Sequence, residues 1–227
     1  MYDLYIANKN YSSWSLRPWV LMRELSIAFN ERLLAFGRHD LWKAFREVSP
    51  PGKVPCLVDQ GTAVWESIAI VEYLAERHTG VWPVNPAARA WARSAAAEMH
   101  AGFSALRSQC SMSCGVRIRL HEIAAPLKAD LARIGVLWNE GLRRFGGPFL
   151  AGKEFCGVDA FFAPVAFRIQ SYGLKPDAPS AAYAQRLLDL PTMREWYAAG
   201  LAETFRDEPH EAEILEVGTV LEDLRST

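Results

Sequence analysis

The spacing of hydrophobic residues changes character once along this chain, between residues 79 and 87, and this change constrains the fold more than any other feature. Before it, short apolar runs typical of strands alternate with helical runs. After it, strand patterns almost disappear and helical patterns follow one another. The intervening TGVWPVNP is rich in proline and glycine. The sequence therefore predicts an α/β domain at residues 1–80, a linker at 81–86 and an all-helical domain at 87–227.

The first 80 residues predict the order strand, helix, strand, hairpin, helix. Gln60-Gly61 separates two apolar runs and is a hairpin signal, and Gly80 follows the last helical pattern as a stop. The expected strands are 3–7, 28–36, 54–59 and 62–66, and the expected helices are 17–27 and 67–78. In the second part we expect helices at 88–109, 126–145, 158–169 and 192–203, and a terminal helix within the acidic tail 206–224.

Charge and composition exclude several classes of protein. The chain has 227 residues, half of them apolar, with 25 basic against 26 acidic side chains. A balanced charge favours neither nucleic acid nor an acidic membrane, so we expect a small-molecule or protein partner. The N-terminus lacks the pattern of a signal peptide, and no window approaches the ~18 apolar residues of a membrane span. We therefore expect a soluble cytoplasmic protein.

The four cysteines are too few and too irregularly spaced for a disulfide framework. Cys110 and Cys114 would share a helix face, as a metal pair could. Because no nearby His or Cys completes a ligand set, we expect reduced thiols in the core or in a pocket, and no metal.

The stretch NKNYSSWSLRP places three serines just before a helix. Pro18 is tolerated only in the first helical turn, which favours Ser15 as the N-cap. Ser12 and Ser13 then lie in the loop beside the positive end of the helix, where hydroxyl and backbone N–H groups can hold an anion such as a thiolate. The alternative is a plain serine-rich turn.

Two further stretches lie next to strands. In SPPGKVPCLVD, a cis Pro55 would turn the backbone of Val54 outward for pairing with an extended peptide, although a loop proline starting an edge strand is the alternative. In WESIAI, Glu66 and Ser67 could bind the ammonium and carboxylate of a zwitterion, although a helix cap with a dipole-complementing acid has the same pattern.

These three sites, in this order and followed by a helical half, resemble the glutathione transferases over essentially the whole chain. YSSWSLRPW is similar to the Ser-Ser-Cys-Ser-x-Arg signature of the serine-type, zeta-like members. The resemblance implies a thioredoxin-like N-terminal domain plus an all-α C-terminal domain, glutathione as co-substrate, and a homodimer. It also implies that Ser12, or alternatively Ser13, donates a hydrogen bond to the glutathione sulfur.

The same resemblance assigns the rest of the glutathione site. Val54, before a cis Pro55, would pair with the cysteinyl backbone, and Glu66 and Ser67 would hold the γ-glutamyl end. Lys53 or His39 would reach the glycine carboxylate. The second-substrate pocket would be lined by Trp14, Phe103, Cys110 and Met112, for which plain core is the alternative.

The resemblance has limits at three positions. FLAGKEFCGVDAFFAP resembles the folding motif of the family, with Asp159 at the acidic place, but Cys156 replaces the capping hydroxyl. Trp14 replaces the cysteine of the zeta pattern and Glu66 its common glutamine, which weighs against maleylacetoacetate isomerase activity.

The activity implied is attack of a glutathione thiolate on an electrophilic small molecule, as in detoxification. A glutathione-dependent isomerase or ether-cleaving enzyme would share the binding site, and a non-catalytic interaction module would share the fold. A thioredoxin-type oxidoreductase would place Cys where Ser12 or Ser15 stands.

Overall fold

The structure, a computed structural model, describes residues 1–37 and 41–226. Its N-terminal part is built on a four-stranded sheet in the order β2-β1-β3-β4. β1 runs parallel to β2 and antiparallel to β3, and β3 and β4 form the expected hairpin. The strands are β1 (Tyr2–Ile6), β2 (Phe29–Leu33), β3 (Cys56–Asp59) and β4 (Thr62–Trp65).

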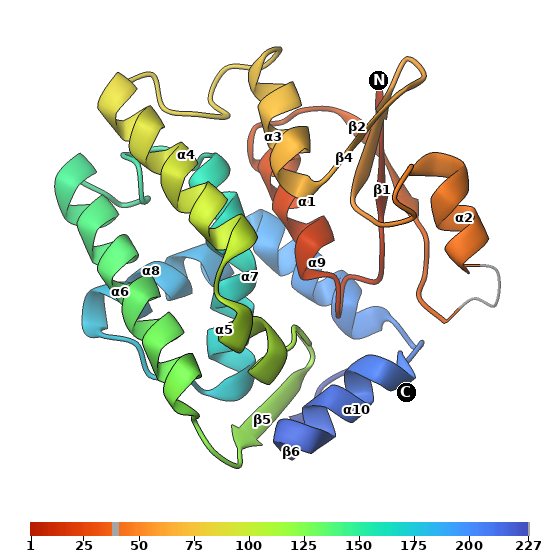
Figure 1. The fold of residues 1–227 in the computed structure, drawn as a ribbon, viewed down its shortest axis with the longest axis vertical. Helices are drawn as coiled ribbons and strands as arrows, with labels where there is room; N and C mark the ends of the chain where they lie inside the picture. Colours follow the sequence, from red (N-terminus) through yellow and green to blue (C-terminus); the bar gives the residue numbers. More distant parts are fainter. Residues whose placement is uncertain (38–40, 227) are drawn as a thin grey trace.

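Helices cover both sides of this sheet. α1 and α3 lie on the side that faces the helical region, and α2 lies on the other side (Figure 1). Leu16, Trp19 and Val20 of α1 are completely buried, because this helix is packed between the sheet and the helices of the C-terminal part. The three helices are α1 (Ser13–Glu24), α2 (Leu41–Val48) and α3 (Ser67–Ala75).

The C-terminal part is mainly helical, with α7 at its centre. α7 packs against α1, α4 and α8, which is why its sequence is apolar along almost its whole length. The helices are α4 (Pro86–Ala101), α5 (Ser104–Gln109), α6 (Ala125–Phe145), α7 (Gly157–Tyr172), α8 (Ala178–Asp189), α9 (Pro191–Ala202) and α10 (Glu208–Val217).

The long helix expected at 88–109 is two helices. The chain breaks at Gly102 and Phe103, where Phe103 has a positive φ of 58°. A Cβ at Gly102 would lie 2.9 Å from the carbonyl oxygen of Glu98, so only glycine fits this close approach. The break directs α5 toward the serine-bearing loop described below.

The region expected to be all-helical also contains a small sheet, and the tail is only partly helical. β5 (Val116–Leu120) and β6 (Gly218–Asp223) pair antiparallel. The expectation of a terminal helix through 206–224 is therefore correct for α10 and wrong for the residues after it. Pairing between segments about a hundred residues apart leaves no local signature in the sequence.

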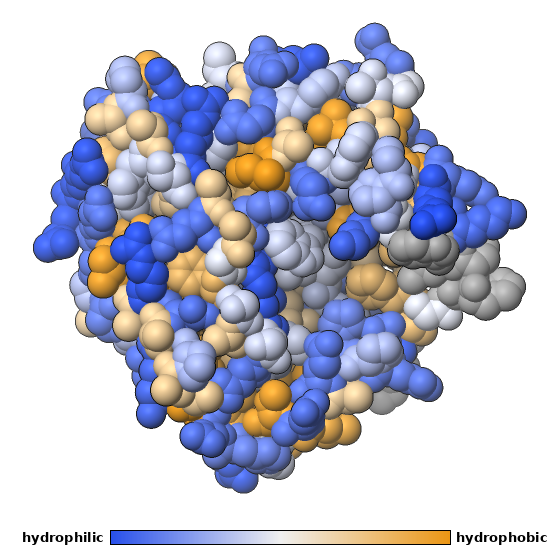
Figure 2. Space-filling model, viewed as in Figure 1, coloured by the Kyte–Doolittle hydropathy of each residue, from blue (hydrophilic) through white to orange (hydrophobic). Residues whose placement is uncertain are grey.

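The surface seen in this orientation is mostly hydrophilic, with small hydrophobic patches separated by polar side chains (Figure 2). In the described part of the chain, no helix is both long and apolar enough to cross a membrane. This face of the molecule therefore shows no broad apolar surface among its described residues, and we look to its cavities for a functional site.

Candidate functional site

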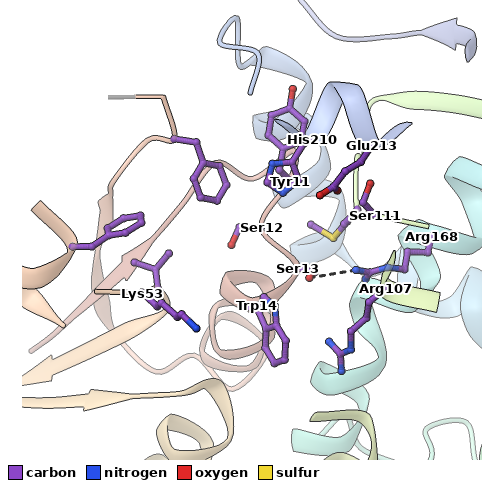
Figure 3. Close-up of a pocket in the computed structure, with 14 residues that line it drawn as sticks. Tyr11, Ser12, Ser13, Trp14, Lys53, Arg107, Ser111, Arg168, His210 and Glu213 are labelled. Carbon is purple, nitrogen blue, oxygen red and sulfur yellow. Dashed lines mark hydrogen bonds between the residues drawn. The ribbon is translucent and has the colours of Figure 1, made fainter. Parts of the chain in front are cut away.

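Ser12 and Ser13 lie in the wall of a cavity of about 290 Å³, which we call the serine cavity. The loop between β1 and α1 supplies one wall. The segment after α5 contributes Met112, α7 contributes Arg168, and α10 contributes His210 (Figure 3). The cavity is therefore assembled from both parts of the chain.

Ser12, not Ser15, is the N-cap of α1. The Ser15 N–H donates to Ser12 Oγ at 3.3 Å, and the Ser12 hydroxyl donates to Ser15 Oγ at 2.7 Å. The expectation for Ser15 is wrong because Pro18 is accommodated inside α1, where it removes a single backbone donor. Burial of the helix against the core compensates for that loss. Ser15 instead accepts a hydrogen bond from the Ala7 N–H at 3.2 Å.

Ser13 faces Arg168. The Arg168 Nη2 group donates to Ser13 Oγ across 3.5 Å, and both residues are buried. Ser12 and Ser13 therefore differ in environment, since Ser12 belongs to a cap and Ser13 lies beside a cation (Figure 3).

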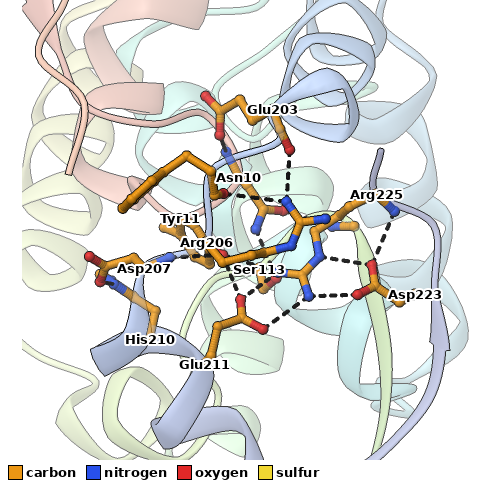
Figure 4. Close-up of polar contacts among 12 residues, drawn as sticks. Asn10, Tyr11, Ser113, Glu203, Arg206, Asp207, His210, Glu211, Asp223 and Arg225 are labelled. Atoms are coloured by element: carbon orange, nitrogen blue, oxygen red, sulfur yellow. Dashed lines mark hydrogen bonds and ion pairs between the residues drawn. The ribbon is translucent and has the colours of Figure 1, made fainter. Parts of the chain in front are cut away.

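Tyr11 also lines the serine cavity, but its hydroxyl is engaged elsewhere. The hydroxyl donates to Glu211 Oε1 at 2.5 Å and accepts from Arg225 Nη1 at 3.1 Å (Figure 4). Burial, and then the hydrogen bond to Glu211, raises the pKa of Tyr11 to about 12. The Tyr11 hydroxyl is thus unsuited to stabilising a neighbouring anion.

A second cavity, of about 250 Å³, lies around Pro55 and is called here the cis-proline cavity. The Val54–Pro55 bond is cis, as the resemblance implied. Among the described residues, the N–H and C=O of Val54 have no hydrogen-bond partner, so both are free to pair with an extended ligand. Lys53 and Val54 line both cavities.

Glu66 lines one end of this cavity, and Ser67, the next residue, lies outside the lining. Glu66 has a strained φ of 68° and its carboxylate is 3.9 Å from His100 Nε2. Ser67 is completely buried, and its hydroxyl lies 3.5 Å from both Arg17 Nη1 and His100 Nδ1. Burial, and then the charge of Arg17, lowers the pKa of His100. His100, with its lowered pKa, lies here close to the guanidinium of Arg17 and the carboxylate of Glu66. This end of the cavity therefore has groups of both charges for a ligand.

Trp14 separates the two cavities and lines both. Two guanidinium groups contact its ring, with the Arg17 group 4.2 Å and the Arg107 group 4.6 Å from the ring centroid. Such cation–π contacts hold the indole in place. Trp14 is therefore positioned to contact ligands in either cavity.

The other residues that the sequence predicted for the site do not all lie in the cavity walls. Met112 lines the serine cavity, whereas Phe103 and Cys110 lie buried beside it and outside its lining. Burial raises the pKa of the Cys110 thiol to about 12, and all four cysteines are free and buried. His39 lies outside the described residues.

Sequence reasoning did not identify the arginines of the site. Arg107 and Arg168 line the serine cavity, and Arg17 lies behind Trp14. One local signal existed, because Arg168 is the only charged side chain of VAFRIQSY, in a helix that is otherwise largely apolar. A charged residue in a buried helix face is a candidate for function.

Residues 11–77 match the model of the family described as glutathione S-transferase, N-terminal domain. A stringent starvation protein A homolog from Pasteurella multocida is 26% identical over 130 residues, which cover 56% of this chain and only 58% of that relative. Glutathione S-transferase GstA from Escherichia coli O157:H7 is 28% identical over 165 residues, 67% of this chain and 76% of that protein.

The fold has solved counterparts. A glutathione transferase homolog from a Burkholderia strain, crystallised with bound glutathione, superposes with a TM-score of 0.66. It is 20% identical, and the superposition covers 88% of this chain and 97% of that one. The chain therefore has the glutathione transferase fold expected from its sequence.

Proposed function

We propose that this chain, which has the fold of the glutathione transferases, binds glutathione and activates its thiol for attack on an electrophilic small molecule. The observation that carries the proposal is the adjacency of the two cavities. The cis-proline cavity offers free backbone groups for a peptide, and it shares Trp14, Lys53 and Val54 with the cavity that is lined by the buried Ser12 and Ser13.

In this proposal glutathione occupies the cis-proline cavity in an extended conformation. Its cysteinyl backbone pairs with Val54, and its γ-glutamyl end lies at Glu66 and Ser67. Lys53, which is exposed and lines both cavities, is placed to meet the glycine carboxylate. The thiol then points past Val54 into the serine cavity.

Ser12 is the proposed donor to the sulfur. Its oxygen caps α1, so the helix N-terminus and the hydroxyl act on the same anion. The Ser12 proton is bonded to Ser15 Oγ in the absence of ligand. The hydrogen bond between the two serines can reverse, so that Ser15 donates to Ser12 Oγ. The Ser15 oxygen accepts from the Ala7 N–H, and among the described residues its hydroxyl proton makes no hydrogen bond. This exchange frees the Ser12 proton for the thiolate.

The test is the pKa of the bound glutathione thiol, followed by ultraviolet absorbance of the thiolate in Ser12→Ala, Ser13→Ala and Ser15→Ala. In the wild type we expect the pKa to lie about two units below its free value of roughly 8.5. Ser12→Ala should raise it by about one unit or more and lower kcat/KM about tenfold or more. Ser15→Ala should produce a smaller rise, because it removes only the partner of Ser12.

Ser108→Ala serves as the matched control, because Ser108 is exposed on α5 and its hydroxyl bonds only to α5 carbonyls. If Ser13→Ala alone raises the thiol pKa, the sulfur partner is Ser13. If calorimetry detects no glutathione binding by the wild type, the enzyme proposal fails and the chain is a non-catalytic module with this fold.

A further inference from the structure

Three arginine side chains converge on the serine cavity and its Trp14 wall. Arg17 is completely buried and Arg168 is 4% exposed. Arg107 and Arg168 line the cavity directly (Figure 3), whereas Arg17 lies over the Trp14 ring and outside the cavity lining. Positive charge is therefore concentrated on one side of the serine cavity.

This charge has no close countercharge. Among residues 1–37 and 41–226, no ion pair involves Arg17, Arg107 or Arg168. Burial, and then the charges of Arg107 and Arg168, lowers the pKa of Arg17. Burial, and then the charge of Arg107, lowers the pKa of Arg168 to about 10. Glu213 also lines the cavity but pairs with none of the three.

Burying a guanidinium group without a carboxylate partner costs free energy of folding. We therefore expect an anionic group of a ligand to bind beside these arginines. In the proposed pose the γ-glutamyl carboxylate of glutathione lies near Ser67, whose hydroxyl is 3.5 Å from Arg17 Nη1, and the thiolate supplies one more negative charge. That single further charge leaves Arg107 and Arg168 undercompensated, since Asp130 acts on Arg107 only at a distance. A second anionic group, beside the thiolate, would offset the remaining positive charge of the arginines.

The two lining arginines are held in position while keeping donors free. Arg107 Nε and Nη2 donate to carbonyl oxygens at the end of α4, whereas Arg107 Nη1 is buried without a partner. Arg168 Nε donates to the Cys110 carbonyl at 2.7 Å, which leaves only the long contact of its Nη2 with Ser13. Groups fixed in this way lose little entropy when they bind a carboxylate.

The rest of the cavity suits an organic molecule. Phe36, Phe45, Trp14 and Met112 line it, and its volume of about 290 Å³ accommodates a small ring. We propose that the electrophile of this protein carries a carboxylate, and that Arg168 and Arg107 bind that carboxylate while the ring faces the glutathione sulfur. This inference rests on the proposed function.

The probe pair is a chlorodinitrobenzoate with the carboxylate para to the chlorine, and its neutral methyl ester. In both reactions the thiolate sulfur forms a bond to the ring carbon and chloride leaves with the electron pair of the C–Cl bond. The thiol proton goes to solvent when the thiolate forms. Division of each kcat/KM by the uncatalysed rate removes the difference in ring activation between acid and ester.

We expect the wild type to prefer the acid over the ester by about tenfold or more. Arg168→Met should abolish that preference, because turnover of the acid should fall about tenfold or more further than turnover of the ester. Arg168→Lys, which keeps the charge, should restore part of the preference. Arg133→Met is the control for loss of a positive charge, because Arg133 is exposed and pairs with Glu98 away from the cavity. Arg107→Met is the second variant if Arg168→Met does not fold.

Calorimetry with the two S-aryl glutathione conjugates gives a readout that requires no turnover. The acid conjugate should bind the wild type at least about tenfold more tightly than the ester conjugate. Equal affinities, or an acid preference that survives in both arginine variants, would overturn the inference while leaving the proposed function intact. If neither glutathione nor either conjugate binds, the proposed function itself fails.

Discussion

At the scale of single residues, the serines near the start of α1 show how one side chain can have a structural and a chemical role together. Ser12 caps α1 and lines the serine cavity, whereas Ser15 accepts a hydrogen bond from the Ser12 hydroxyl. Asp159 is the counterpart in α7. It accepts hydrogen bonds from the N–H groups of Leu150 and Cys156 and from the Tyr183 hydroxyl. This carboxylate therefore joins the N-cap residue of α7 to the chain before the helix and to α8.

Asp159→Ala should lower the free energy of unfolding by about 3–5 kcal/mol at acidic pH, because it leaves buried donors unpaired. Burial raises the pKa of Asp159 from 3.8 to about 6, so the native state binds the proton more tightly than the unfolded state. The contribution of Asp159 is therefore fully present below pH 3.8 and falls as pH rises toward about 6.

Urea unfolding of Asp159→Ala and wild type at about pH 5 and about pH 7 checks this, with the larger difference expected at the lower pH. A difference that grows with pH would contradict the assignment. Glu154→Ala is a suitable control, since Glu154 is an exposed carboxylate near the same helix start.

At the scale of elements, the loop between β1 and α1 is held by the C-terminal part. Glu203, just after α9, accepts from the N–H groups of Lys9 and Asn10 at 2.7 and 3.1 Å. The Asn10 side chain accepts from the Gly115 N–H and donates to Ser113 (Figure 4). The position of Ser12 and Ser13 therefore depends on contacts with residues about a hundred or more positions later.

Tyr11→Phe separates the two possible roles of Tyr11. Its hydroxyl ties the loop to Glu211 of α10 and to Arg225, so its loss should lower the free energy of unfolding by about 1–3 kcal/mol. The pKa of the bound glutathione thiol should stay within a few tenths of the wild-type value, because the hydroxyl is bonded elsewhere. A clear rise of the thiol pKa in Tyr11→Phe would instead make Tyr11 the sulfur partner.

At the scale of the whole molecule, the serine cavity lies where the sheet-bearing part meets later segments of the chain, whereas the adjoining cis-proline cavity is lined by the sheet-bearing part alone. A dimer adds a further level of organisation that we propose from the family resemblance. Sedimentation equilibrium should then give twice the chain mass of 25.4 kDa at micromolar concentration. A mass of one chain across the accessible concentration range would contradict the homodimer.

Local pattern alone determined a large part of this protein. Helical and strand periods, the Gln60-Gly61 turn and the prolines specify the order of the first seven elements apart from α2, since these signals arise within a few residues of chain. The serines and the Val54–Pro55 segment were recognisable for the same reason.

Only the tertiary structure decided that Ser12 is the cap of α1, that β5 pairs with β6, and that Arg107 and Arg168 line one cavity while Arg17 lies behind its Trp14 wall. The arginines come from three helices that are far apart in sequence, and only Arg168 differs in character from its own neighbours. The chemistry of the pocket depends on the summed field of these charges in a buried space, which exists only after long-range packing has excluded water.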